Sequence, residues 1–240
     1  MVKALDGIKI LDLSSGSVAG IATMILADFG ADVIKIERPG GDPFRFLPNS
    51  PMWLRGKRSV ELDLKRKVEQ SRLHFLAQSV DVVVSNIRQD SAVGLGADYD
   101  VLSAKNSGLV YVHLTGFGKH GRYSSYPGYE DVVAAKTGRM QSFAGTVSRE
   151  GPQFSAVQVA SHAASQAIVS GVLAALIVRN RTGMGQYVQT SMLRSMLVYE
   201  QGDLIRRQLA EIDSELYLSL IHISEPTRRT PISYAVFCLK

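Results

Sequence analysis

The stretch "IKILDLSSGSVAGIATMILADFGADVIKIE", residues 8–37, decides the fold of this chain. Its two ends, residues 8–13 and Asp32–Glu37, are short apolar runs typical of buried strands. Between them, residues 18–30 place apolar side chains at helical spacing and end on a glycine suited to a helix C-terminus. A strand, a helix and a second strand in this order predict two parallel strands joined by a right-handed crossover.

The same alternation continues along the chain. We expect further strands at 59–64, 80–86 and 109–117, and helices at 65–79 and around 99–106. A long apolar helix then leads through a glycine-containing turn into another strand. Apolar strands separated by helices are covered on both faces, which predicts an α/β fold with a doubly wound, mostly parallel sheet.

Ligands of such sheets bind at the carboxyl ends of the strands. The loops after Leu13, Glu37, Asn86 and Thr115 are therefore the places where we expect a site. The string "GFGKHG" at 116–121 follows a strand and matches the dinucleotide pattern G-x-G-x-x-G. It continues as "RYSSYPGY", which reads as a loop, so no helix N-terminus is expected there to hold a pyrophosphate.

Composition narrows the class of protein. The 240 residues, 45% of them hydrophobic, can bury one sizeable core. We find no uninterrupted apolar run of about 18 residues and no signal-peptide pattern, so we expect a cytoplasmic protein without a membrane span. The single cysteine, Cys238, excludes an internal disulfide framework and a cysteine-rich metal site.

The last part of the chain, "LSLIHISEPTRRTPISYAVFCLK" at 218–240, differs from everything before it. A helical pattern gives way there to short apolar pieces cut by Pro226 and Pro231. This string closely resembles the in-frame translation of a sequencing-library adapter. We therefore expect a domain over residues 1–217 followed by a non-native tail; the alternative is a genuine C-terminal hairpin.

The charge favours a small anionic ligand. Of the total net charge of +5, residues 218–240 contribute +2, which leaves +3 for the rest of the chain. We find no cluster of basic residues of the kind that binds nucleic acid, so no nucleic-acid partner is expected. A mildly basic chain without such a cluster suits a small polyanion better.

Two basic segments stand next to predicted strands. The loop at 37–46, "ERPGGDPFRF", combines glycines with Arg38 and Arg45, and a guanidinium there could clamp a phosphate or stack on a purine. The alternative is an arginine on a solvated loop. Lys57, between Arg55 and Arg58, precedes the next strand and could complete a phosphate-binding rim.

Metal and serine-hydrolase chemistry are not expected. His74, His120 and His162 lack metal-ligand spacing with one another, so we predict no metal site. Ser161 is followed by His162, but a nucleophile and its base usually come from separate segments, and no G-x-S-x-G elbow is present.

Several strings together resemble the class III CoA-transferase family (CaiB/BaiF type). They cover nearly all of residues 5–200, in the family's order: "LDGIKILDLS", "ILADFGADVIKIERPGGDP", "KRSVELDLK", "DVVVSN", "VYVHLTGFGKHGRYSSYPGYEDVV" and "GVLAALIVRNRTGMGQYVQTSML". The resemblance implies the large, doubly wound domain of an enzyme that moves coenzyme A (CoA) from an acyl-CoA to a carboxylic acid. It also implies a homodimer in the full-length protein, no tightly bound cofactor, and a small domain that we expect to be absent from this chain.

The resemblance also implies site residues. Arg38, Lys57 and Asn86 fall where CoA-contacting residues lie, and Glu130 falls on an active-site carboxylate. The family's nucleophile is an aspartate, which attacks the thioester to give a mixed anhydride and then a covalent aspartyl-CoA. At that position this chain carries Ser161.

Serine is not a chemical substitute for that aspartate. An acylated serine is an oxygen ester, which is more stable than the thioester and would stall the cycle, and an unassisted hydroxyl is a weak nucleophile. Three hypotheses stay open. The chain is an active transferase that uses another carboxylate, such as Glu130, Asp131 or one from a partner; it is a non-catalytic homologue or a degenerate half of a larger transferase; or it is a doubly wound domain with another small-ligand role.

Overall fold

The computed structural model describes residues 3–142 and 150–213. The chain divides into two compact units, Met1–Met196 and Leu197–Lys240, and the sheet and the candidate site belong to the first of them. The tail expected at 218–240, and the domain boundary expected before it, lie outside the described residues.

The first unit is built on a six-stranded sheet in which all described strands are parallel, in the order β3-β2-β1-β4-β5-β6. This confirms the predicted α/β class and the doubly wound sheet. The order of the strands reverses between β1 and β4, which makes their carboxyl ends the topological switch point where ligands of such sheets bind. The strands are β1 (Lys9–Asp12), β2 (Asp32–Glu37), β3 (Lys57–Glu61), β4 (Val82–Ser85), β5 (Val110–Thr115) and β6 (Tyr187–Ser191).

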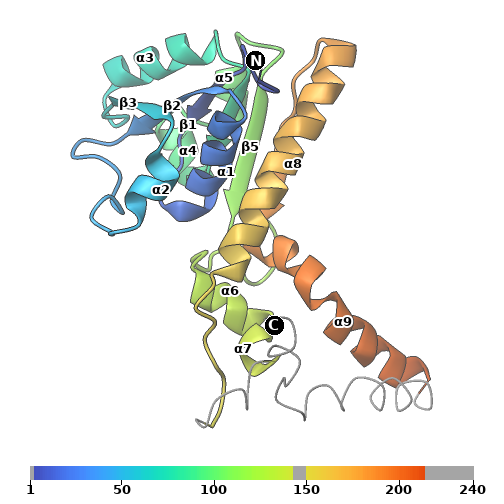
Figure 1. Cartoon of the computed structure of the whole chain (residues 1–240). Helices are drawn as coiled ribbons and strands as arrows, with labels where there is room; N and C mark the ends of the chain where they lie inside the picture. The colour runs from blue at the N-terminus through green and yellow to red at the C-terminus, as the bar shows by residue number, and fades with distance from the viewer. Residues whose placement is uncertain (1–2, 143–149, 214–240) are drawn as a thin grey trace, which may run out of the picture. The chain divides into compact units, whose positions relative to one another are not determined.

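Helices cover both faces of the sheet (Figure 1). The helices are α1 (Ser17–Asp28), α2 (Ser50–Leu54), α3 (Lys67–Ala77), α4 (Gln89–Gly94), α5 (Tyr99–Ser103), α6 (Glu130–Lys136), α7 (Arg139–Ser142), α8 (Val159–Thr182) and α9 (Met192–Ile212). Five of them have between four and seven residues, too few for the helical period to show clearly in the sequence, and four of these five, α2, α4, α6 and α7, were not predicted.

Alternate residues of the central strands enter two separate cores, as the two-residue period of a strand requires. On one face α1 and α8 lie side by side, and the core between them and the sheet includes Ile10, Val84, Val112, Leu26 and Ile168. On the other face α3 and α5 cover a second core that includes Leu11, Val83, Tyr111, Leu73 and Leu102.

Helix α8 has the length and composition of a helix that could cross a membrane, with a mean hydropathy of 1.6 over its most apolar stretch. Half of that stretch is buried within the protein, which is also the pattern of a core helix. The helix ends at Gly183, whose φ of 74° is left-handed and favours glycine. The chain then turns into β6, which confirms the predicted helix, turn and strand.

The turn into β6 brings two backbones together at Gly185. A Cβ atom at this position would lie 2.1 Å from the carbonyl oxygen of Leu109, the residue before β5. The Gly185 N–H donates to the carbonyl of Ser107 over 2.8 Å, which starts the pairing of β6 with β5. Only glycine fits this approach, because the opposing atoms are backbone and cannot move aside.

Gly185→Ala is expected to lower the free energy of unfolding by about 2–4 kcal/mol, since the overpacked backbone must shift. Urea unfolding followed by the fluorescence of Trp53, the single tryptophan, measures this change. Gly94→Ala is the matched control, because nothing lies within 4 Å of its Cβ position, and it should change stability by no more than about 1 kcal/mol. Equal effects of the two variants would contradict this account of the turn.

Candidate active site

A cavity of about 580 Å³ opens at the carboxyl ends of the first four strands in the chain. Its walls come from the loops after β1, β2, β3 and β4, so it lies at the switch point of the sheet and includes the loops expected after Leu13, Glu37 and Asn86. Apolar side chains and a few charged ones share the lining. The apolar ones are Leu13, Ile36, Leu62, Leu64, Ile87 and Leu95, the basic ones are Lys35, Arg38 and Lys65, and the acidic ones are Glu37, Asp42 and Asp63.

Arg38 is placed as the sequence predicts, on the wall of this cavity at the end of β2. Its side chain is exposed, and within the described part of the chain no hydrogen bond or ion pair engages its guanidinium. Arg45, from the same loop, instead donates to the carboxylate of Glu37. Arg38 is thus the arginine of this loop that is available to an anionic ligand.

Lys57 occupies a different place from the one predicted. Its ammonium is buried, with 2% of the side chain exposed, and lies 2.9 Å from a carboxylate oxygen of Asp12. It also donates to the hydroxyl of Thr23 and to the carbonyl of Gly20. The side chain therefore crosses from β3 to β1 and α1 inside the fold and does not form part of the cavity wall, which argues against the predicted CoA contact.

Asp12 is the centre of this buried cluster. Burial alone would raise its pKa, but the charges of Lys35 and Lys57, with hydrogen bonds from Ser14 and Lys57, outweigh burial and lower the pKa to about 2. For Lys57, burial lowers the pKa and the carboxylate of Asp12 opposes that shift. We conclude that Asp12 is ionised in the folded protein across the physiological range.

The depressed pKa of Asp12 predicts a contribution to acid stability. Its pKa is about 2 in the folded chain and 3.8 in the unfolded chain, so the stabilisation is complete above about pH 4 and is lost as the pH falls toward 2. The difference corresponds to about 2 kcal/mol. Urea unfolding of the wild type and Asp12→Asn should show a stability gap at pH 6 that narrows steadily below about pH 4. A gap that stays constant down to about pH 2 would contradict the assigned pKa.

Asn86 lies at the end of β4 and joins two loops of the cavity. Its side-chain oxygen accepts from the Ser15 N–H over 3.0 Å, and its amide nitrogen donates to the Ser15 carbonyl over 2.9 Å. Both ends of the side chain are therefore engaged with the loop after β1. The CoA contact implied for Asn86 stays a prediction, and the geometry shows a side chain that holds the neighbouring loop.

Glu130 and Ser161 meet, although 31 residues separate them. The Glu130 carboxylate accepts from the Ala160 N–H over 2.9 Å, from the Ser161 N–H over 2.7 Å and from the Ser161 hydroxyl over 2.8 Å. It caps the first turn of α8, where unpaired N–H groups and the helix dipole favour an anion. A carboxylate therefore lies within hydrogen-bonding distance of Ser161, the position at which the resemblance implies the family's aspartate.

A close crossing of two backbones brings Glu130 to α8. A Cβ atom at Gly116 would lie 2.5 Å from the Cα atom of Gly128, so the loop that leaves β5 at Gly116 returns to its own start at Gly128. Helix α6 begins two residues later, at Glu130. This loop contains the "GFGKHG" string, and no helix begins within it, as the sequence predicts.

The Glu130–Ser161 contact and the cavity lie at the same edge of the sheet. Helix α8 leads into β6 and so runs opposite to the strands, which places its first turn at their carboxyl ends. The Ser165 hydroxyl, one turn after Ser161, donates over 2.6 Å to the carbonyl of Val18 in the first turn of α1. Because α1 follows the cavity loop after β1, this bond links the two parts of the site.

Removal of the Glu130 charge should weaken the start of α8. Glu130→Gln places an amide nitrogen against N–H donors, and we expect stability to fall by about 1–2 kcal/mol. Asp131→Asn is the matched control, because Asp131 has the same charge and helix turn but is exposed. Thermal unfolding of both variants measures the difference. Equal losses would show that the three hydrogen bonds to Glu130 contribute nothing specific.

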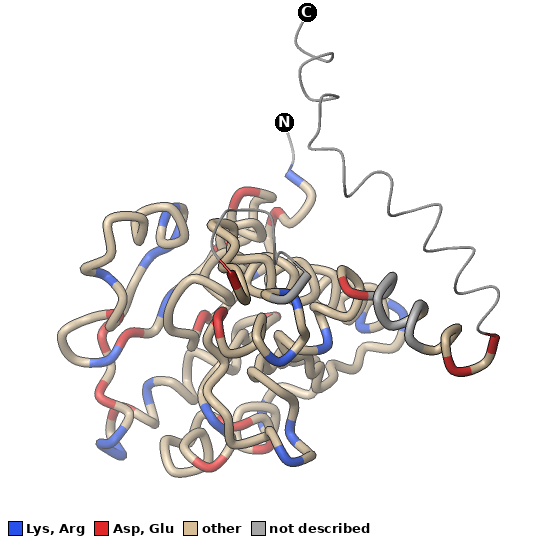
Figure 2. Tube along the Cα trace, turned by 90° about the horizontal axis from the view of Figure 1, so that it is seen from below, with Lys and Arg blue, Asp and Glu red and all other residues tan. Residues whose placement is uncertain are grey.

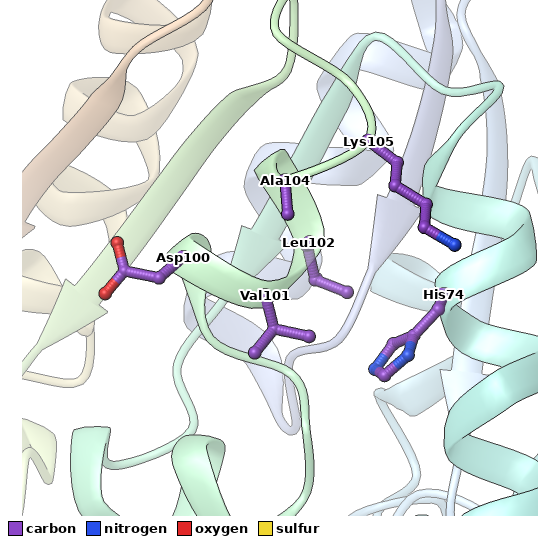
Figure 3. A pocket seen from close by; sticks show the side chains of 6 residues that line it. All are labelled: His74, Asp100, Val101, Leu102, Ala104 and Lys105. Carbon is purple, nitrogen blue, oxygen red and sulfur yellow. The ribbon is translucent and has the colours of Figure 1, made fainter.

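A second, smaller hollow lies between α3 and α5, toward the amino ends of the strands (Figure 3). His74 faces Val101 and Leu102 there, while the carboxylate of Asp100 points away from the histidine. His74 is already bonded to the carbonyl of Gly96 over 2.8 Å. We therefore assign no chemistry to this hollow.

Basic and acidic residues are interspersed along the trace of the first unit (Figure 2). Sequence reasoning missed several charged residues of the cavity, among them Lys35 and Asp42, both of which are buried. The signal for Lys35 was a lysine in the middle of the apolar strand "DVIKIE", where a charge must find a partner.

A parallel sheet with a cavity at its switch point, and an exposed arginine on the wall that has no partner among the described residues, is typical of α/β proteins that bind anionic ligands. The profile of CoA-transferase family III matches residues 5–214, and the chain belongs to this family. The resemblance found in the sequence is thereby confirmed.

Relatives support the same assignment. Succinate–glutarate CoA-transferase of Agrobacterium fabrum is 34% identical over 205 residues, which are 79% of this chain and 51% of that protein. Succinyl-CoA:mesaconate CoA-transferase of Haloarcula hispanica is 34% identical over 221 residues, covering 81% and 53%. The crystal structure of Rv3272 from Mycobacterium tuberculosis matches with 32% identity and a TM-score of 0.81, covering 87% of this chain and 60% of that one. The chain spans about half the length of the curated relatives it matches.

Proposed function

We propose that this chain is the CoA-binding large-domain part of a CoA-transferase, which moves CoA between an acyl-CoA and a small carboxylic acid. The observation that carries the proposal is the cavity at the switch point in a chain of CoA-transferase family III, with Arg38 on the cavity wall and without a partner among the described residues. The substrates are proposed as a class; the printed names of two relatives include succinate, glutarate and mesaconate.

The lining of the cavity suits the nucleotide end of CoA. The apolar side chains of Leu13, Ile36 and Ile87 offer a surface for a flat purine ring, while Arg38 and Lys65 offer positive charge to phosphates. Polar groups on an otherwise apolar wall are the usual arrangement of a small-molecule site. We further propose a cytoplasmic homodimer for the full-length protein.

The chemistry requires a carboxylate. A carboxylate oxygen attacks the thioester carbonyl, the C–S bond breaks, and CoA leaves as the thiolate, which gives a mixed anhydride. The thiolate then attacks the enzyme's carbonyl, releases the first acid and leaves CoA on the enzyme as a thioester, from which the second acid takes it. Ser161 cannot do this, because its ester would not return the acyl group. Among the described residues, Glu130 is the carboxylate bonded at this position.

A second candidate function is a non-catalytic CoA-binding homologue, or the degenerate half of a larger transferase. The bonds to Glu130 favour it, because three donors stabilise the carboxylate charge and lower its nucleophilicity. In this case the chain would bind CoA and leave the acyl transfer to another active site.

Both candidate functions require that the chain binds CoA, and a binding measurement tests this requirement. Isothermal titration of the chain with CoA should give saturable binding, and Arg38→Met should weaken it about tenfold through loss of a charge-assisted phosphate contact. Arg58→Met is the matched control, since Arg58 is exposed on β3 and paired with Asp32 at 2.6 Å. No binding by the wild-type chain would refute the proposed function, and equal weakening by both variants would refute the role of Arg38.

Chemical trapping separates the two candidates. Incubation with an acyl-CoA followed by hydroxylamine should convert a glutamyl-CoA thioester to a hydroxamate, and we expect peptide mass spectrometry to place the mark on Glu130. Glu130→Gln is the control and should carry no mark. An unmodified chain that still binds CoA would reject catalysis by this chain and support the second candidate.

A further inference from the structure

The loop at residues 14–16, between β1 and α1, forms part of the cavity wall through Ser14 and Ser15. Side chains from other elements hold its backbone. The Ser14 N–H donates to Asp12 over 3.0 Å, and both backbone groups of Ser15 bond to Asn86, at 3.0 Å and 2.9 Å. These contacts fix the middle of the loop from β1 and β4.

A buried ion pair fixes the two ends of the same loop. The Lys35 ammonium donates to the Ser14 carbonyl over 2.7 Å, and the Asp42 carboxylate accepts from the Gly16 N–H over 3.3 Å. The two charges lie 3.0 Å apart, with 2% and 1% of their side chains exposed. The other oxygen of Asp42 accepts from the Phe44 N–H over 2.8 Å.

The pair therefore joins the loop after β1 to the loop after β2, which carries Arg38. Lys35 belongs to β2, and Asp42 lies four residues beyond Arg38. Two buried charges cost desolvation free energy, and well-packed apolar residues often hold a core equally well. A charged pair in the wall of a ligand cavity has a different use, because it fixes two loops at defined positions before the ligand arrives.

We propose that Lys35 and Asp42 are positioning residues of the CoA site, which hold the loop at 14–16 against the Arg38 loop so that CoA meets a preformed cavity. This inference rests on the proposed function and adds to it the residues that shape the site. Arg38 is the residue that would contact the phosphates, and the ion pair acts through its loop.

The variant Lys35→Met/Asp42→Leu tests the proposal, because it removes both charges and leaves no buried charge unpaired. We expect its dissociation constant for CoA, measured by isothermal titration, to rise at least about tenfold, because the two loops must be ordered on binding. Hydrogen exchange of the unliganded variant should also be faster in peptides that cover residues 13–16.

The matched control is Arg179→Met/Asp81→Leu, which removes an ion pair of 2.8 Å at the opposite edge of the sheet. Its dissociation constant for CoA should stay within about twofold of the wild-type value, even if its melting temperature falls as far as that of the Lys35→Met/Asp42→Leu variant. A loss of stability alone does not reshape the cavity. If the Lys35→Met/Asp42→Leu variant does not fold, it is replaced by Asp42→Asn, which keeps the shape of the side chain. The expected rise in the dissociation constant for CoA is the same.

The outcomes separate this inference from the proposed function. Binding by the wild type with equal affinity in the Lys35→Met/Asp42→Leu variant would overturn the inference and leave the CoA site standing. Equal weakening in both double variants would also overturn it, because the effect would then follow general stability. A wild-type chain that does not bind CoA would overturn the proposed function and the inference with it.

Discussion

Buried charges on three adjacent strands shape the site of this protein. Asp12 of β1, Lys35 of β2 and Lys57 of β3 lie inside the fold, where an unpaired charge would be strongly destabilising. Their partners satisfy them in a fixed geometry: Lys57 pairs with Asp12, and Lys35 pairs with Asp42. Because parallel strands end at one edge of the sheet, the same contacts fix the loops that surround the cavity.

The cavity and the Glu130–Ser161 contact occupy neighbouring but separate parts of this edge. The cavity belongs to β1–β4, while the Glu130–Ser161 contact belongs to α6 and α8. The Ser165–Val18 hydrogen bond connects them through the first turn of α1. The cavity has Arg38 on its wall, and no described residue pairs with its guanidinium. At the position where the resemblance implies a nucleophilic aspartate, the chain has Ser161, whose hydroxyl donates to the Glu130 carboxylate.

Much of the fold follows from the sequence, because its signals are local. The period of the apolar residues gave the central strands and longer helices, and the alternation of strands and helices gave the parallel sheet and the edge where the cavity opens. The same reasoning put Arg38 at the end of a strand, where it lines the cavity, and its contact with CoA stays a prediction. The family resemblance added Glu130 and drew attention to Ser161.

The parts of the site that the sequence did not predict depend on contacts between distant segments of the chain. Lys57 reads as part of a solvated basic trio, and only its pairing with Asp12, 45 residues away, buries it. The sequence predicts that Asn86 contacts a ligand. Only the structure brings it next to the loop after β1, where its amide bonds to the backbone of Ser15. The bond from Ser161 to Glu130 depends on the crossing of Gly116 and Gly128, which no period in the sequence reveals.

The central claim is that CoA occupies the cavity at the carboxyl ends of β1–β4, between two loops that are already in place. A crystal structure of the chain with CoA tests it most directly. The account predicts the nucleotide between the loop at 14–16 and the Arg38 loop, with the guanidinium on a phosphate and the Lys35–Asp42 pair intact. A nucleotide bound at another place, or a cavity that forms only after the pair has separated, would contradict it.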